Sequence, residues 1–139
     1  MTQRSKIEHV LARWALGYDE GDVAMMESCF TEDAQIRMEI GQRDGTQEVM
    51  GPYLGRGEVM GLFTEHQGVQ SDQRRHVTTN LVITDDRGGE ASVVSYLSLF
   101  VTDKDGTRLQ ATGVYRDEFV EQAGDWRIRR RFLHLDSRY

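Results

Sequence analysis

The second half of the chain is dominated by four long segments in which apolar and polar residues alternate. They are separated by short stretches rich in Asp and Gly, with the sequences DDRGG, DKDG and QAGD. Alternation with a period of two is typical of strands that bury one face, and connections of this kind are typical of hairpins. The pattern therefore predicts an antiparallel meander with strands over residues 74–84, 90–102, 107–121 and 125–135.

The first half predicts helices and one strand. Between Ile7 and Tyr18 the apolar residues recur at helical spacing, while Gly21 and Asp22 supply the signals that end one helix and cap the next. Alternation begins at Ala34, and the glycines that follow it favour turns with at most a short strand. The predicted elements are helices over 6–18, 23–30 and 57–67 and a strand over 34–40. This order predicts a single α+β domain over residues 1–139, in which a strongly curved sheet wraps around helices and leaves a cavity.

Charge and cysteine content narrow the classes of function. The chain has 23 acidic and 17 basic residues, and the resulting net charge of −6 repels nucleic acids and anionic membranes. Cys29 is the only cysteine, which excludes an intramolecular disulfide. The first residues lack the apolar core of a secretory signal, and no apolar stretch is long enough to cross a bilayer. We therefore expect a cytoplasmic protein without nucleic-acid or membrane partners.

Neither a cofactor nor a metal ion is expected. The stretch GPYLGRGEVMG lacks the preceding strand and the lysine that make a glycine-rich loop bind phosphate. His134 and Asp136 are two residues apart, and His66 would join them only by an accident of folding, so the sequence predicts no metal site.

His76 heads the strand segment RRHVTTNLVI and is the first candidate for chemistry. Imidazole is the usual general base near neutral pH, and a carboxylate such as that of Asp19 can fix its tautomer and orientation. The alternative is that Asp19 caps the helical hairpin and His76 is an ordinary strand residue, which is the commoner situation for an isolated Asp or His. If the strand is regular, Thr78, Asn80 and Val82 share the face of His76.

Tyr18 and the arginine-rich segment near the C-terminus are further candidates. Tyr18 could donate to a developing enolate or alkoxide, or it could simply complete the apolar stripe of the first helix. In the final strand we expect Arg131 to share a face with Arg127, Arg129 and Leu133, opposite Trp126, Ile128, Arg130 and Phe132. Exposed strand arginines that pair with Asp117 or Glu118 are the commoner alternative to an anion-binding role.

Three stretches, YDEGDVAMMESCFTEDA, RRHVTTN and GDWRI, together resemble the SnoaL-like branch of the nuclear-transport-factor-2-like superfamily over nearly the whole chain. The resemblance implies a cone-shaped α+β fold with a deep pocket. Within this branch, the chain resembles scytalone dehydratase and hexachlorocyclohexane dehydrochlorinase at the positions of their catalytic residues. By that resemblance Asp19 and His76 match a catalytic pair, and Tyr18 matches the tyrosine that precedes the aspartate in scytalone dehydratase. Arg131 matches an active-site arginine of the dehydrochlorinase, and the spacing from His76 to Asn80 is also like that of the dehydrochlorinase.

The resemblance also implies a function and its alternatives. It implies a cofactor-independent lyase, of the dehydratase or dehydrohalogenase type, or an isomerase that acts on a small, largely apolar or aromatic cyclic substrate. The catalytic residues would be Asp19 and His76, and the substrate-binding residues Tyr18, Asn80 and Arg131. The second histidine of scytalone dehydratase is missing, since the matching strand offers Gln110 and Thr112 instead.

Two alternatives stay open within the same superfamily. One is a non-catalytic ligand-binding or assembly subunit, like the β-subunit of ring-hydroxylating dioxygenases, and the other is a polyketide cyclase or hydrolase. Because a curved sheet leaves one face to be covered, we also expect a homodimer or homotrimer.

Overall fold

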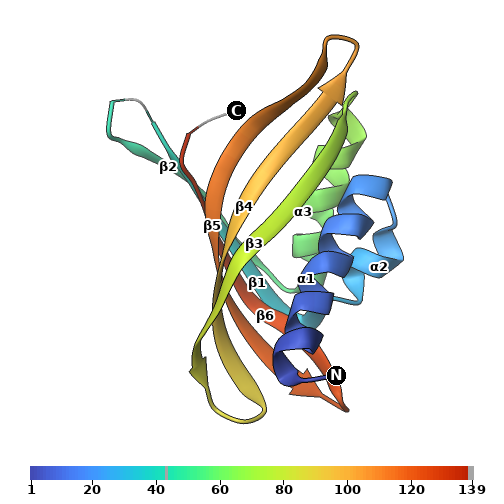
Figure 1. Cartoon of the computed structure of the whole chain (residues 1–139), viewed down its shortest axis with the longest axis vertical. Coiled ribbons are helices and arrows are strands. Elements are labelled where there is room, and N and C mark those ends of the chain that lie inside the picture. Colours follow the sequence, from blue (N-terminus) through green and yellow to red (C-terminus); the bar gives the residue numbers. More distant parts are fainter. Residues whose placement is uncertain (43, 138–139) are drawn as a thin grey trace.

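The computed structural model describes residues 1–42 and 44–137, which form three helices and one six-stranded sheet. The helices are α1 (Gln3–Glu20), α2 (Val23–Glu27) and α3 (Arg56–Val69), and the strands are β1 (Phe30–Gly41), β2 (Gln47–Leu54), β3 (Gln73–Asp86), β4 (Glu90–Asp103), β5 (Gly106–Gln122) and β6 (Asp125–Leu135). The helices lie together on one side of a curved, unclosed sheet (Figure 1). The predicted α+β class is confirmed.

Strand order is β2-β1-β6-β5-β4-β3, and it confirms the predicted meander from β3 to β6. Two features differ from the prediction. The glycine-rich stretch after β1 contains a strand of eight residues, β2, which pairs with β1 through a bulge between Ile36 and Met38. In addition, β1 pairs with β6 in parallel, so the sheet is mixed rather than antiparallel throughout. The long connection through β2 to β5 permits this parallel pair.

The core lies between the helices and the inner face of the sheet. Ile7, Leu11 and Trp14 on α1 are almost fully buried and form one cluster with inward residues of the sheet such as Val93 and Leu97. Full burial of an aliphatic side chain contributes roughly 1.5–3 kcal/mol of transfer free energy. The amphipathic pattern that predicted the first helix therefore also predicted the face that it buries.

The arginine-rich end of β6 does not alternate as predicted. Trp126 and Ile128 point inward, and so does Arg131, whereas Arg130 is exposed. The cause is a register shift against β5, where Glu118 pairs with Arg130 but Phe119 pairs with Ile128. The extra residue of a β-bulge reverses the alternation beyond it. Only one arginine of the run is thereby turned into the core.

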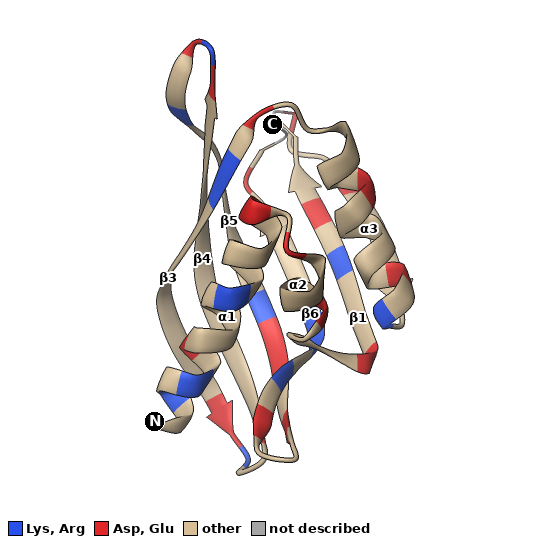
Figure 2. Cartoon of the chain, turned by 90° about the vertical axis from the view of Figure 1, so that its right-hand side faces the viewer, with Lys and Arg blue, Asp and Glu red and all other residues tan. Residues whose placement is uncertain are grey.

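Charged residues are spread over the molecule. On the helical side, acidic and basic residues are interspersed along the helices and the visible strands (Figure 2). None of the helices in the described part of the chain has the length and apolarity needed to cross a bilayer.

Candidate active site

Asp19 and His76, the residues predicted to form a pair, meet on the inner face of the sheet. Asp19 lies in the last turn of α1, which is closed by Gly21 in the left-handed conformation (φ 73°). His76 lies near the start of β3, and its Nδ1 is 2.6 Å from Oδ1 of Asp19. Because a carboxylate only accepts hydrogen bonds, this contact favours the tautomer of the neutral imidazole that has its proton on Nδ1 and the lone pair that a base needs on Nε2.

The second oxygen of Asp19 holds the backbone of the same residue. Since β3 is at the edge of the sheet, one side of the strand has no neighbouring strand. There the backbone N–H of His76 donates to Oδ2 of Asp19 at 2.9 Å. Gln73 donates from Nε2 to the backbone carbonyl of Asp19, also at 2.9 Å, and ties the end of α1 to β3. One carboxylate thus fixes both the ring and the backbone of His76.

Aromatic side chains of α1 surround the imidazole. The rings of Tyr18 and Trp14 stand edge-on to the His76 ring, with centroids 4.8 and 5.2 Å away. The phenol oxygen of Tyr18 accepts a hydrogen bond from Nε2 of Gln70 at 2.6 Å. Tyr18 therefore belongs to the apolar stripe and lies beside the candidate base as well. The two interpretations of this residue do not exclude each other.

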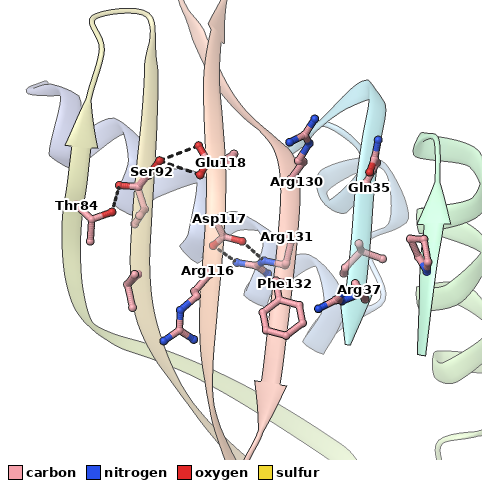
Figure 3. A pocket seen from close by; sticks show the side chains of 14 residues that line it. Gln35, Arg37, Thr84, Ser92, Arg116, Asp117, Glu118, Arg130, Arg131 and Phe132 are labelled. Atoms are coloured by element: carbon pink, nitrogen blue, oxygen red, sulfur yellow. Dashed lines mark hydrogen bonds and ion pairs between the residues drawn. The ribbon is translucent and has the colours of Figure 1, made fainter. Parts of the chain in front are cut away.

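Arg131 forms an ion pair with Asp117 in the core, as seen in Figure 3. Its Nε and Nη2 donate to the two oxygens of Asp117 at 2.8 and 3.0 Å, and the side chains are 1% and 0% exposed. The guanidinium carbon also lies 3.8 Å from the ring centroid of Tyr115. Burial alone would lower the pKa of Arg131, but the Asp117 carboxylate outweighs it and holds that pKa above the ordinary value. The guanidinium therefore stays charged.

Trp14, Tyr18, His76 and Arg131 line one small cavity of about 50 Å³, and most of its lining side chains are buried. Its walls include Trp14, Tyr18, Leu62, Phe63, His76, Tyr115 and Arg131. A volume of this size holds a few water molecules, whereas small-molecule pockets commonly measure about 300–1,000 Å³. The deep pocket that the resemblance implies is therefore narrow here, and a cyclic compound would enter only if lining side chains moved.

One end of the cavity lies near a hollow on the surface. His66 at the end of α3 and Arg74 at the start of β3 line the cavity and also border a hollow on the surface. The cavity therefore comes near the surface between α3 and β3, while His76 also borders the open groove between α1 and β3.

Asn80 does not share the inner face with His76, contrary to the predicted alternation. The pairing of β3 with β4 shifts register between Thr79 and Val82, and Asn80 is exposed with a positive φ of 57°. Beyond this bulge the alternation is reversed, so that Val82 is 54% exposed. Asn80 instead borders an open groove between β3 and α1. Asp19 and His76 border this groove as well, whereas Asn80 is not among the residues that line the cavity. A substrate-binding role for Asn80 stays a prediction.

A broader hollow lies on the opposite, outer face of the sheet (Figure 3). Arg37, Arg116, Arg130, Glu118 and Phe132 border it. It is open to solvent, which screens its charges, and it contains no histidine held by a carboxylate. The smaller, enclosed cavity is therefore the better candidate for proton transfer. Within residues 1–42 and 44–137 no group of three or more His, Cys, Asp or Glu side chains is placed to hold a metal ion.

Two residues were not predicted as site residues: Trp14, which lines the cavity, and Asp117, which pairs with the cavity residue Arg131. Trp14 was predicted only as part of the apolar stripe of the first helix. Asp117 was considered only as a partner of exposed arginines, although it falls in the inward row of β5 between Tyr115 and Phe119. A buried carboxylate needs a cationic partner. The position of Asp117 on the same face of the strand as two aromatic residues was the signal in the sequence that could have identified it as buried and paired.

Comparison with known proteins places the chain in a family. It matches the model of the SnoaL-like domain over residues 1–132. No curated protein is significantly similar in sequence. Rv3472 of Mycobacterium tuberculosis, a protein of unknown function, is similar in structure with a TM-score of 0.79 and 28% identity, over 96% of this chain and 72% of that one.

Two further solved structures show the same fold at lower identity. A protein assigned as the β-subunit of an aromatic-ring-hydroxylating dioxygenase from Novosphingobium aromaticivorans has a TM-score of 0.81 and 22% identity, over 97% of this chain and 90% of that one. An NTF2-like protein with a cystatin-like fold from the same species has a TM-score of 0.74 and 19% identity, over 95% and 80%. The helices on one face of a curved sheet and the match over residues 1–132 lead to one conclusion: the chain belongs to the SnoaL-like domain family and has the nuclear-transport-factor-2-like fold.

Proposed function

We propose that the protein is a cofactor-independent lyase, of the dehydratase or dehydrohalogenase type, or an isomerase that acts on a small, largely apolar cyclic compound. The observation that carries the proposal is the carboxylate of Asp19, which fixes the ring and backbone of His76 at the wall of an enclosed cavity. A base positioned in this way, with its free lone pair on Nε2, can remove a proton from carbon or oxygen.

Each remaining group has a role in this proposal. Asp19 orients the imidazole and stabilises the imidazolium that forms when Nε2 takes the proton. Arg131 supplies a permanent positive charge toward the electron-rich side of the substrate, and Tyr18 supplies a phenol beside the base. The narrow cavity favours a compact substrate, and its mainly apolar walls favour one with few polar groups.

Replacement of the base tests the proposal. His76→Ala should lower turnover by about 10²–10⁴-fold, because the proton acceptor is lost while the fold is kept. Candidate substrates are cyclic ketones and cyclohexenes that carry a hydroxyl or halide, and NMR in D₂O follows both proton exchange and product formation. His134→Ala is the matched control, since it removes a second strand histidine outside the cavity and should leave turnover unchanged. Unaltered turnover in the His76 variant, with a normal thermal melt in both, would refute the assignment.

The alternative is a non-catalytic assembly subunit. The similarity in fold to the dioxygenase β-subunit, at a TM-score of 0.81, supports it. An assembly subunit needs no base, so every substrate in the panel should be left unchanged by the wild-type protein. A polyketide cyclase or hydrolase would use the same pair, His76 and Asp19, and would differ only in the reaction that follows removal of the proton.

The expected homodimer or homotrimer stays a prediction. Val77 and Val82 on β3 and Tyr96 on β4 project from the outer face and are 39%, 54% and 51% exposed. Apolar side chains on neighbouring strands of an open face favour burial against a second copy.

A further inference from the structure

Two buried N–H groups at the cavity lack hydrogen-bond partners. They are Nε1 of Trp14 and Nη1 of Arg131, and neither has an acceptor within the part of the chain that the structure describes. Both residues line the cavity that contains His76, and they are only 5% and 2% exposed. Buried donors are nearly always satisfied in native proteins, so each exception calls for an explanation.

The residues around Arg131 provide a hydrogen-bond acceptor for two of its three guanidinium nitrogens. Nε and Nη2 are taken by the oxygens of Asp117, which leaves Nη1. The guanidinium carbon lies 3.8 Å from the ring centroid of Tyr115 and 4.9 Å from that of Trp14. Such contacts stabilise the positive charge through the ring faces, but they offer no lone pair to the N–H group.

The two residues that carry these donors are neighbours, and one of them contacts the base. The 4.9 Å contact makes Trp14 and Arg131 direct neighbours, and the Trp14 ring centroid is 5.2 Å from that of His76. An indole donor and a charged guanidinium donor on residues that line the same cavity as the base are suited to an oxygen that becomes negative as a proton leaves the adjacent carbon.

We infer that Trp14 Nε1 and Arg131 Nη1 bind the carbonyl oxygen of the substrate, so that the substrate class is a small enolisable ketone and Trp14 is a catalytic residue. The inference rests on the proposed function of His76 and specifies what its substrate carries. Nε2 of His76 takes a proton from the carbon next to the carbonyl. The electron pair of that C–H bond forms a C=C bond, and the carbonyl π pair moves onto oxygen as an enolate held by the two donors. The enolate then regains a proton at another carbon or expels a β-hydroxide or β-halide.

Binding of an enolate mimic tests the inference without turnover. The probe is 4-nitrophenol, whose phenolate is a planar oxyanion with its own absorbance. The wild-type protein should bind the phenolate form and lower the pKa of the phenol. Replacement of Trp14 by benzothienylalanine, an isostere with sulfur in place of N–H, should weaken binding by about 10- to 100-fold, the effect of losing one hydrogen bond to a charged group. Trp14→Phe should do the same, and the isostere keeps the test valid if the smaller ring disturbs folding.

Two controls separate this inference from the proposed function. Trp126→Phe removes the other tryptophan N–H of the chain, outside the cavity, and should leave phenolate binding unchanged. His76→Ala should lower turnover by about 10²–10⁴-fold and still bind the phenolate, because the donors do not depend on the base. Equal phenolate binding by the wild type and the benzothienylalanine variant would overturn the role of Trp14, as would a wild-type protein that binds no phenolate. Unaltered turnover in the His76 variant, together with normal phenolate binding, would refute the role of His76 as the base and leave the role of Trp14 intact.

Discussion

A histidine–carboxylate pair lies on each face of the sheet, and the two pairs have the same chemical groups in different surroundings. On the inner face, His76 Nδ1 is 2.6 Å from Asp19, and the side chains are 9% and 5% exposed. On the outer face, His134 Nδ1 is 3.1 Å from Glu39, and the side chains are 28% and 19% exposed. Proximity of an imidazole and a carboxylate is therefore not what distinguishes a candidate catalytic pair in this molecule.

The difference lies in what faces the second ring nitrogen. Nε2 of His134 is 3.8 Å from a carboxylate oxygen of Asp136, in a setting that water reaches. The side chain of His76, 9% exposed, is instead bordered by Trp14 and Tyr18 and lines the small inner cavity. Exclusion of water strengthens every electrostatic interaction inside a site. Enclosure, more than pairing, makes the inner histidine the candidate base.

The largest expected effect on turnover comes from changing the carboxylate of the inner pair, Asp19, to its amide. In Asp19→Asn the amide nitrogen can donate to Nδ1 of His76, which favours the tautomer with the proton on Nε2 and removes the lone pair needed for proton abstraction. We expect turnover to fall by about 10²–10⁴-fold. Steady-state kinetics on the best substrate of the panel measures this effect.

Glu39→Gln is the matched change on the outer face. It breaks the corresponding contact with His134 and should alter neither turnover nor substrate affinity. If both amide variants reduced turnover equally, the contrast between the faces would disappear, and the inner pair would have to be regarded as structural.

A second expected effect concerns stability and the buried ion pair next to the inner histidine. Asp117→Asn leaves the guanidinium of Arg131 in the core without a counter-charge, and loss of one partner of such a pair costs about 3–5 kcal/mol of unfolding free energy. Glu39→Gln, in a pair that water partly reaches, should cost less than about 1 kcal/mol. Urea denaturation of the two variants measures both values. Similar losses would show that the interior of this sheet is far more hydrated than its burial indicates.

The sequence predicted the elements far better than the details that shape the site. Periodicity located the helix that carries Asp19 and the strand that begins at His76, and the resemblance to the SnoaL-like branch suggested that they meet. The alternation of residues predicted the wrong face of the strand for Asn80 and for the residues near Arg130, and in both places a bulge was the cause. A bulge depends on how two strands pair across the sheet, and a period of two within one strand carries no information about that.

The pairing of Arg131 with Asp117 shows a related limit. The sequence pointed to an acidic partner on the neighbouring strand, but it could not decide whether the pair faces water or the core. That choice follows from the same bulge, which turns Arg131 to the inner face beside Trp14. The sequence thus predicted that an arginine would pair with an acidic residue of the neighbouring strand, but the burial of the pair depends on how the strands pair in the folded sheet.

The smallest expected effect is on the pH dependence of the unfolding free energy, and it tests how well water is excluded from Cys29 near α2. Cys29 is 1% exposed, and burial raises the pKa of its thiol, with the charge of Arg13 offsetting this only in part. The folded thiol therefore stays protonated at a pH where the unfolded chain, with an ordinary value of about 8.5, begins to ionise. Unfolding free energy should fall as pH rises above that value, and the fall should be absent in Cys29→Ala. Urea denaturation from pH 7 to 10 measures the difference. Parallel pH profiles for the two proteins would mean that water reaches the inner face at Cys29, and the contrast between the enclosed and the open face would then not extend to this end of the sheet.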